Sequence, residues 1–336
     1  MELAHFTMNF FRQISIGGYH PVRVRHFNLL GGYHEAINYP VVTTRIAVWS
    51  GRVREALMPR IIGVHGIGQQ FEGEQLLEQK WLPALRDGLT RAGCPASAEA
   101  SFAMAFYGDL FRGKGKSGGA SLDVQDLTAW EVDLLRLWWE EAARTDQAVR
   151  SPELLGKGVA DWCQRGLNAL SRSKVFNAVG QRFMVADLKQ VRAYVTDKEV
   201  RLAARKRVEA QVNQDTRVIV GHSLGSVVAY EALCANPQWP VTHLVTLGSP
   251  LGIRNLIFDA LDPGPLDGRG QWPGSVSKWT NISADNDVVA FTKALAPLFG
   301  EVIDKRVLSG QFPGAHDASR YLSSEEAGEA IADGLR

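Results

Sequence analysis

The chain has 336 residues, and its 37 Lys and Arg against 36 Asp and Glu give a formal net charge of only +1. Hydrophobic residues make up 45% and charged residues 22%, which is ordinary for a globular protein and argues against a wholly disordered chain. A net charge so close to zero gives no global electrostatic reason to expect nucleic acid or an anionic membrane surface as a partner.

The three cysteines are few, odd in number and far apart, so they predict neither a disulfide framework nor a zinc site. A reducing compartment is therefore the default, and we expect a cytoplasmic protein. No run of 18 or more apolar residues occurs, which predicts no transmembrane segment. The first residues, MELAHFTMNFFRQ, lack a basic stretch followed by an apolar one, so no secretory leader is expected.

Residues 1–57 differ in composition from the rest of the chain. They hold six Arg, no Lys and four of the eight His. Apolar and polar residues alternate loosely in segments 21–29 and 43–49, which predicts strands there. We expect an N-terminal extension of uncertain role, either a peripheral β segment or a part outside the functional core.

From Met58 to Arg336, short apolar runs alternate with helical patterns. Strands are predicted at 61–65, 100–108, 217–221, 241–248, 277–283 and 305–310. Helices are predicted at 73–92, 224–235, 288–299 and 323–335. Strands that alternate with helices predict an α/β domain over 58–336 with a mostly parallel sheet flanked by helices.

The interval 112–215 interrupts this alternation. Four helical stretches are predicted in it, at 123–143, 153–170, 174–195 and 198–213. Asp123 is the expected N-cap of the first. A mostly helical segment between two sheet strands is typical of an insertion over the strand ends. We expect it to form a helical cap.

The strongest motif is VIVGHSLGS at 218–226, in which Gly221 to Gly225 fits G-x-S-x-G. It follows a predicted strand and precedes an apolar helix, the context in which a sharp turn lifts a serine hydroxyl above a sheet. The helix N-terminus adds partial positive charge nearby. Ser223 is therefore the candidate nucleophile.

Such a serine needs a base and an acid later in the chain. His222 is adjacent to Ser223, so its side chain should diverge from the hydroxyl, and His243 lies early in a predicted strand. His316 lies in a loop after the last predicted strand, and we expect it to be the base.

For the acid, Asp285 and Asp287 both qualify, since both follow the strand predicted at 277–283. The apolar pair after Asp287 favours that residue, which would hold the histidine tautomer and stabilise the imidazolium. The other carboxylate is then expected to lie in a solvated turn or to cap a helix.

An oxyanion hole needs two backbone N–H groups. One is expected from Leu224, directly after the nucleophile. The other is expected from the loop after the first strand, His65-Gly66-Ile67-Gly68, with Ile67 preferred and Gly66 next.

In these motifs the chain resembles the α/β-hydrolase-fold lipases and esterases. VHGIG, GHSLG, TLGSPLG at 246–252, DNDVV and the late AHDAS loop follow that family's order over about 61–321. The pairing of VHGIG with GHSLGSVVAYEAL is most similar to intracellular lipase-like serine hydrolases, including DDHD-type phospholipases and the inositol-deacylase-like group. The resemblance also implies that Met58 begins the family-like part.

The expectation is therefore an α/β-hydrolase-fold serine esterase with a Ser223–His316–Asp287 triad. Its substrate would be a carboxylic ester, from a lipid or another acyl compound. No metal or organic cofactor and no nucleic acid is implied, transient contact with a membrane surface stays open, and the oligomeric state is unknown. Two alternatives remain: a thioesterase, amidase or peptidase with the same triad, or a non-catalytic binding module of the same fold.

Overall fold

The computed structural model describes residues 58–112, 123–152, 158–173, 176, 181–307 and 316–336. All of them belong to a unit that runs from Leu57 to Arg336. The N-terminal extension predicted for residues 1–57, with its two predicted strands, lies outside the described residues.

One six-stranded sheet organises this unit, in the order β2-β1-β3-β4-β5-β6. Every neighbouring pair of strands is parallel, which confirms the predicted α/β class. The strands are β1 (Ile61–Val64), β2 (Phe102–Ala105), β3 (Val218–His222), β4 (His243–Leu247), β5 (Lys278–Ala284) and β6 (Ile303–Val307). The strand order reverses direction at β1, and ligands of such sheets bind outside the carboxyl ends of the strands at this kind of switch point.

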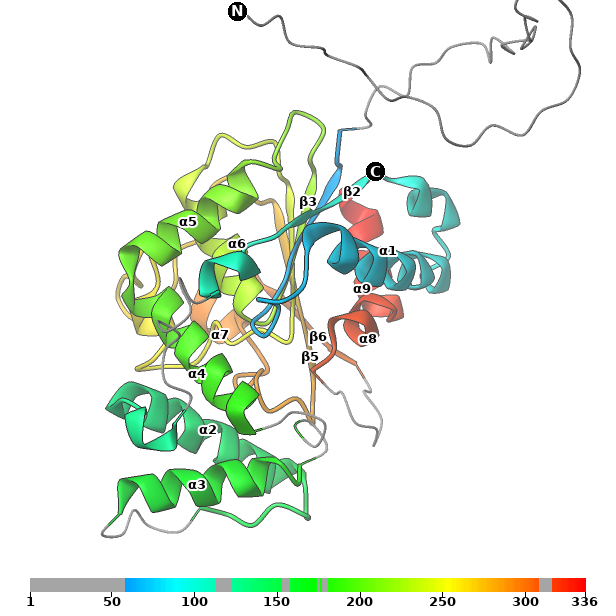
Figure 1. Cartoon of the computed structure of the whole chain (residues 1–336). Helices are drawn as coiled ribbons and strands as arrows, with labels where there is room; N and C mark the ends of the chain where they lie inside the picture. The colour runs from blue at the N-terminus through cyan, green and yellow to red at the C-terminus, as the bar shows by residue number, and fades with distance from the viewer. Residues whose placement is uncertain (1–57, 113–122, 153–157, 174–175, 177–180, 308–315) are drawn as a thin grey trace, which may run out of the picture. The chain divides into compact units, whose positions relative to one another are not determined.

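Helices cover both faces of the sheet (Figure 1). One face packs against α1 (Glu74–Arg91), α8 (Ala318–Leu322) and α9 (Glu325–Gly334), and the other against α6 (Leu224–Ala235). Alternate residues of strands β1 to β5 enter the two apolar cores, as Val218 and Val220 do on the α1 side and Ile219 on the α6 side. Burial on both faces explains the short, unbroken apolar runs in the sequence.

The described residues of the insertion between β2 and β3 form four α-helices, α2 (Ala129–Thr145), α3 (Val159–Leu170), α4 (Gln181–Thr196) and α5 (Lys198–Glu209). Helix α5 packs against α6 and so belongs to the layer beside the sheet, whereas α2 and α3 lie beyond α4, farther from the sheet (Figure 1). The insertion is therefore two structural parts rather than one.

The start of the first insertion helix was predicted wrongly. Asp123 caps a short 3₁₀ turn (Val124–Asp126), while Thr128 is the N-cap of α2. Thr128 and Glu131 form a reciprocal capping box, which satisfies two N–H groups at the helix start. This capping box sets the start of α2 at Thr128, five residues after Asp123.

The helix predicted at 288–299 is also wrong, since only α7 (Ala296–Phe299) is helical. Side chains hold the backbone of this segment instead: Asp287 accepts from the N–H groups of Val289 and Ala290, and Asp304 accepts from those of Leu295 and Ala296. Backbone groups satisfied in this way do not need a helix.

The end of the chain differs from prediction in two smaller ways. The helix predicted at 323–335 is α9, which begins after its N-cap Ser324, but the short helix α8 before it was not predicted. The last strand, β6, begins at Ile303, two residues before the predicted start, and the predicted residues 308–310 lie outside the described residues. Within the described residues, no helix combines the length and the apolar character that crossing a membrane requires.

Candidate active site

Ser223 occupies the turn between β3 and α6 in a backbone conformation that L-residues rarely adopt, with φ 54° and ψ −131°. Hydrogen bonds fix this turn: the Ser223 N–H donates to the Leu247 carbonyl at 3.0 Å, and the Ser223 carbonyl accepts from the Ser226 hydroxyl at 2.6 Å. A strained residue held by its surroundings is typical of a functional site.

Two glycines make this turn sterically feasible. A Cβ atom on Gly221 would lie 2.6 Å from the Cα atom of Ser226, and one on Gly225 would collide with the carbonyl oxygens of Val64 and His65. The glycines of the G-x-S-x-G motif are therefore required by the close approach of α6 to β1 and β3.

The predicted acid and base lie together. Asp287 Oδ2 is 2.8 Å from His316 Nδ1 and accepts a hydrogen bond from the Tyr321 hydroxyl at 2.6 Å, while Oδ1 accepts from the N–H groups of Val289 and Ala290. Burial of this fully enclosed carboxyl alone would raise its pKa. The positive charge and hydrogen bond of His316, with the hydrogen bond from Tyr321, outweigh burial and lower the pKa of Asp287 to about 2.

Asp285, the alternative acid, does not contact His316. Its side chain is 82% exposed and pairs with Arg306 at 3.0 Å. This is the solvated turn position expected for the carboxylate that the base does not use. Of these two aspartates, Asp287 is the one placed to orient His316.

The second ring nitrogen of His316, Nε2, does not face Asp287. His316 Nε2 is buried and has no hydrogen-bond partner among the described residues, and Ser223, only 2% exposed, makes no hydrogen bond to it there. Nucleophile–base hydrogen bonds are often long before a substrate binds.

The side chain of His222 lies against His316, with ring centroids 4.6 Å apart, and also near Trp81 and Tyr321. Burial and the nearby charge of His316 lower the pKa of His222 to about 3, so it is neutral at neutral pH. It therefore supports the His316 ring without adding a second cation.

A second loop, residues 65–68, follows β1 and is called the oxyanion loop here. The Tyr107 N–H donates to His65 Nε2 at 3.1 Å, so the ring proton lies on Nδ1 and donates to the Gly66 carbonyl at 2.7 Å. Burial lowers the pKa of His65 to about 4, which keeps this tautomer neutral.

The tautomer of His65 sets the direction of the next N–H group. In a planar trans peptide the N–H points opposite to the C=O, so the hydrogen bond to Gly66 turns the Ile67 N–H away from His65. A Cβ atom on Gly66 would lie only 2.7 Å from the Ser223 Cβ atom, so this loop borders the serine. The Leu224 N–H, in the first turn of α6, has no acceptor within its helix.

Helices of the insertion contact both loops. Gln190 of α4 accepts from the Gly68 N–H at 3.2 Å and donates to Gln70 Oε1 at 3.1 Å. The segment 285–293, called the acid loop here, is tied to α2, because Lys293 bonds the Asp287 carbonyl and lies 3.4 Å from Glu141. Insertion helices therefore lie at the carboxyl ends of the strands, beside Ser223.

Sequence reasoning missed four residues that shape this site: His65 as a holder of the loop, Tyr321, Lys293 and Gln190. His65 belonged to a recognised motif, but its hydrogen bonds depend on Tyr107, which is distant in sequence. Tyr321, five residues after His316, carries no pattern of its own. The other two depend on which insertion helix meets which loop.

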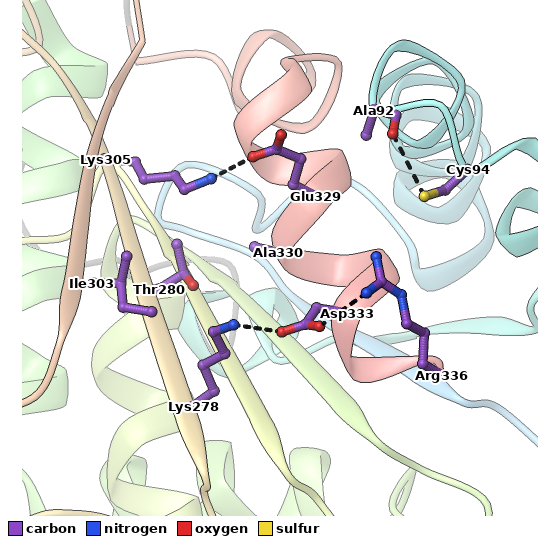
Figure 2. A pocket seen from close by; sticks show the side chains of 10 residues that line it. All are labelled: Ala92, Cys94, Lys278, Thr280, Ile303, Lys305, Glu329, Ala330, Asp333 and Arg336. Atoms are coloured by element: carbon purple, nitrogen blue, oxygen red, sulfur yellow. Dashed lines mark hydrogen bonds and ion pairs between the residues drawn. The ribbon is translucent and has the colours of Figure 1, made fainter.

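His243, the third histidine considered, lies at the start of β4, at the amino ends of the strands and so on the opposite side from Ser223. It neighbours Asp333 there, near a pocket of about 300 Å³ at the amino ends of β5 and β6 (Figure 2). The cations of this pocket are paired, Lys278 and Arg336 with Asp333 and Lys305 with Glu329. It therefore offers no unpaired charge to a ligand.

In the part of the chain that the structure describes, no group of three or more His, Cys, Asp or Glu side chains is arranged to hold a metal ion. Comparisons with protein-family models, curated proteins and solved structures find no match to this chain.

Proposed function

We propose that this chain is a serine hydrolase of the α/β-hydrolase fold that cleaves carboxylic esters. One observation carries the proposal: the buried, ionised Asp287 holds His316 at 2.8 Å, and the His316 ring packs on His222, the residue before a serine in a strained strand-to-helix turn. The chain order Ser, Asp, His and the position of the serine agree with this family.

In the proposed reaction, Ser223 Oγ attacks the acyl carbonyl and its proton passes to His316 Nε2, the buried nitrogen that lacks a partner. Asp287 fixes the Nδ1–H tautomer and stabilises the imidazolium. The N–H groups of Ile67 and Leu224 bind the oxyanion. His316 then protonates the leaving alcohol, and water releases the acid from the acyl-enzyme.

The insertion supplies the substrate side in this proposal. Helices α2 and α4 touch the acid loop and the oxyanion loop, so they act as a cap that shapes the acyl site and excludes water. An acyl or lipid ester is the substrate class proposed.

A second candidate is a binding module that keeps the fold without the chemistry. It is favoured by the 2% exposure of Ser223 and by the lack of a Ser223–His316 hydrogen bond among the described residues. This candidate predicts a serine that does not react.

The deciding experiment is labelling with a fluorophosphonate, read as a mass increase of the intact protein. Wild type and the Ser277→Ala control, which changes an exposed serine at the amino end of β5, are expected to gain one label, and Ser223→Ala none. A folded wild type that takes no label would overturn the enzyme proposal in favour of the binding module.

A further inference from the structure

Helix α4 places a second carboxyl group beside the candidate active site. Asp187 and Gln190 are three residues apart, so they share one face of α4. Gln190 bonds the Gly68 N–H, and a Cβ atom on Gly68 would lie 3.4 Å from Asp187 Oδ1. The carboxyl group of Asp187 therefore lies over the end of the oxyanion loop.

Within the described residues, Asp187 accepts no hydrogen bond and pairs with no cation, although Gln190 beside it makes two hydrogen bonds. A carboxylate that is partly removed from water without a partner is unfavourable. Burial raises the pKa of Asp187 to about 7, against the opposing effect of the positive charge of His316. The structure of the protein alone gives no reason for this arrangement.

The place of this carboxyl group relates it to a bound acyl group. Asp187 contacts the position of Gly68, which follows Ile67, and the Ile67 N–H would bind the acyl oxygen. The positive charge of His316 also acts on the pKa of Asp187, and His316 would accept the proton of the attacking serine. In the proposed mechanism, Asp187 and His316 Nε2, which has no partner among the described residues, would therefore border the same reacting centre.

We propose that Asp187 is a substrate-recognition residue, whose carboxyl group binds a hydrogen-bond donor, a hydroxyl or an ammonium group, that the substrate carries close to its acyl carbonyl. This proposal rests on the proposed esterase function. A plain alkyl ester would leave the carboxyl group unpaired, whereas a donor would satisfy it, and sites built around such a bond discriminate strongly against substrates that lack the donor.

The test compares four esters with wild type, Asp187→Ala and Asp187→Asn. Ethyl butyrate is the reference without a donor. Ethyl 3-hydroxybutyrate and ethyl 3-aminobutyrate carry a hydroxyl and an ammonium on the acyl side, and glycerol monobutyrate carries hydroxyls on the alcohol side. The readout is the ratio of kcat/KM for each donor-bearing ester to that for ethyl butyrate. Wild type is expected to favour at least one of them about tenfold, the factor for one hydrogen bond to a charged group.

Asp187→Ala is expected to reduce that ratio about tenfold. Asp187→Asn separates the two sources, because the amide oxygen still accepts from a hydroxyl but lacks the negative charge that pairs with an ammonium, so the preference for the ammonium ester should fall more. The control Asp133→Asn, at an exposed position of α2, is expected to keep the wild-type ratio.

A wild type that hydrolyses ethyl butyrate without preferring any donor would overturn this inference alone, as would an unchanged ratio in Asp187→Ala. Absence of both ester hydrolysis and fluorophosphonate labelling in wild type would instead overturn the proposed function, and this inference with it. Labelling of Ser223 in both Asp187 variants serves as the check that their sites are folded.

Discussion

The oxyanion loop and the acid loop leave the same edge of one sheet, yet they are held by opposite kinds of interaction. The oxyanion loop is fixed by neutral groups, the His65 imidazole and the Gln190 amide. The acid loop is fixed by ionised groups, Asp287 with His316 and Lys293 with Glu141. Each environment suits the charge that the proposed reaction would create there.

The two environments act on two carboxyl groups near one histidine. The acid loop lowers the pKa of Asp287 to about 2, and burial beside the oxyanion loop raises that of Asp187 to about 7. Burial opposes ionisation in both cases, so the partners decide the outcome: Asp287 accepts hydrogen bonds from His316 and Tyr321, whereas Asp187 accepts none from the described residues. Carboxyl groups whose environments separate their pKa values are typical of sites that assign them different roles.

The largest effect is expected from removing the charge of the acid loop. Asp287→Asn should reduce kcat/KM for an ester about 10⁴-fold, because the amide leaves His316 in the wrong tautomer. Asp285→Asn, two residues away and exposed, is the matched control and should change it less than about twofold. Equal losses in the two variants would break the distinction between these aspartates.

The oxyanion loop can be tested through His65. His65→Ala removes the donor to the Gly66 carbonyl and should lower kcat about 10²-fold, with a smaller change in KM, because the Ile67 N–H loses its orientation. His65→Asn can still donate from a similar position and should recover part of the loss. His243→Ala, at the amino ends of the strands, is the control. A loss seen only in KM would contradict an oxyanion role for this loop.

These two loops also show how far the sequence could predict the molecule. Strands β1 to β5 and helices α1 and α6 were predicted to within two or three residues, because buried parallel strands and amphipathic helices have distinct periods. The motif residues Asp287 and His316 come together because chain order fixes which strand end each follows.

What the sequence could not predict depends on contacts between distant segments. The irregular backbone after Asp287 is set by side chains of β5 and β6, such as Asn281, Ser283 and Asp304. The placement of Asp187 depends on how α4 packs on the oxyanion loop, which no local pattern encodes. A helical period in the sequence shows that one face of an insertion helix is buried, but not which loop or helix that face packs against.

The link between the acid loop and α2 offers a third test, on stability. Lys293 is largely buried between Glu141 and the Asp287 carbonyl, and burial lowers its pKa. Lys293→Met should lower the free energy of unfolding by about 2–3 kcal/mol, since the loop loses its tether and Arg144 becomes the one cation among the described residues that pairs with Glu141. Urea denaturation measures this. Lys80→Met, which breaks an exposed pair with Glu72, should cost less than about 1 kcal/mol, and similar values for the two variants would contradict a structural role for the buried link.

The smallest expected effect is the most direct test of the contrast between the two carboxyl groups. The pKa of Asp187 rises on folding from 3.8 to about 7, so the native state binds this proton more tightly than the unfolded state. Its contribution to stability is therefore full below pH 3.8 and is lost as the pH rises through about 7. Asp187→Asn lacks this loss, so its free energy of unfolding should gain on that of wild type by about 1–2 kcal/mol between pH 4 and pH 8, the partial exposure of the side chain limiting the gain. The exposed Asp133→Asn should show no such trend in parallel urea titrations.

The pH dependence of the stability contributed by Asp287 has the opposite sign. Its lowered pKa makes its contribution full above pH 3.8 and lost as the pH falls towards about 2. A gain in Asp187→Asn that is the same at every pH would mean that Asp187 is not held against ionisation, and the two loops would then not differ electrostatically as described.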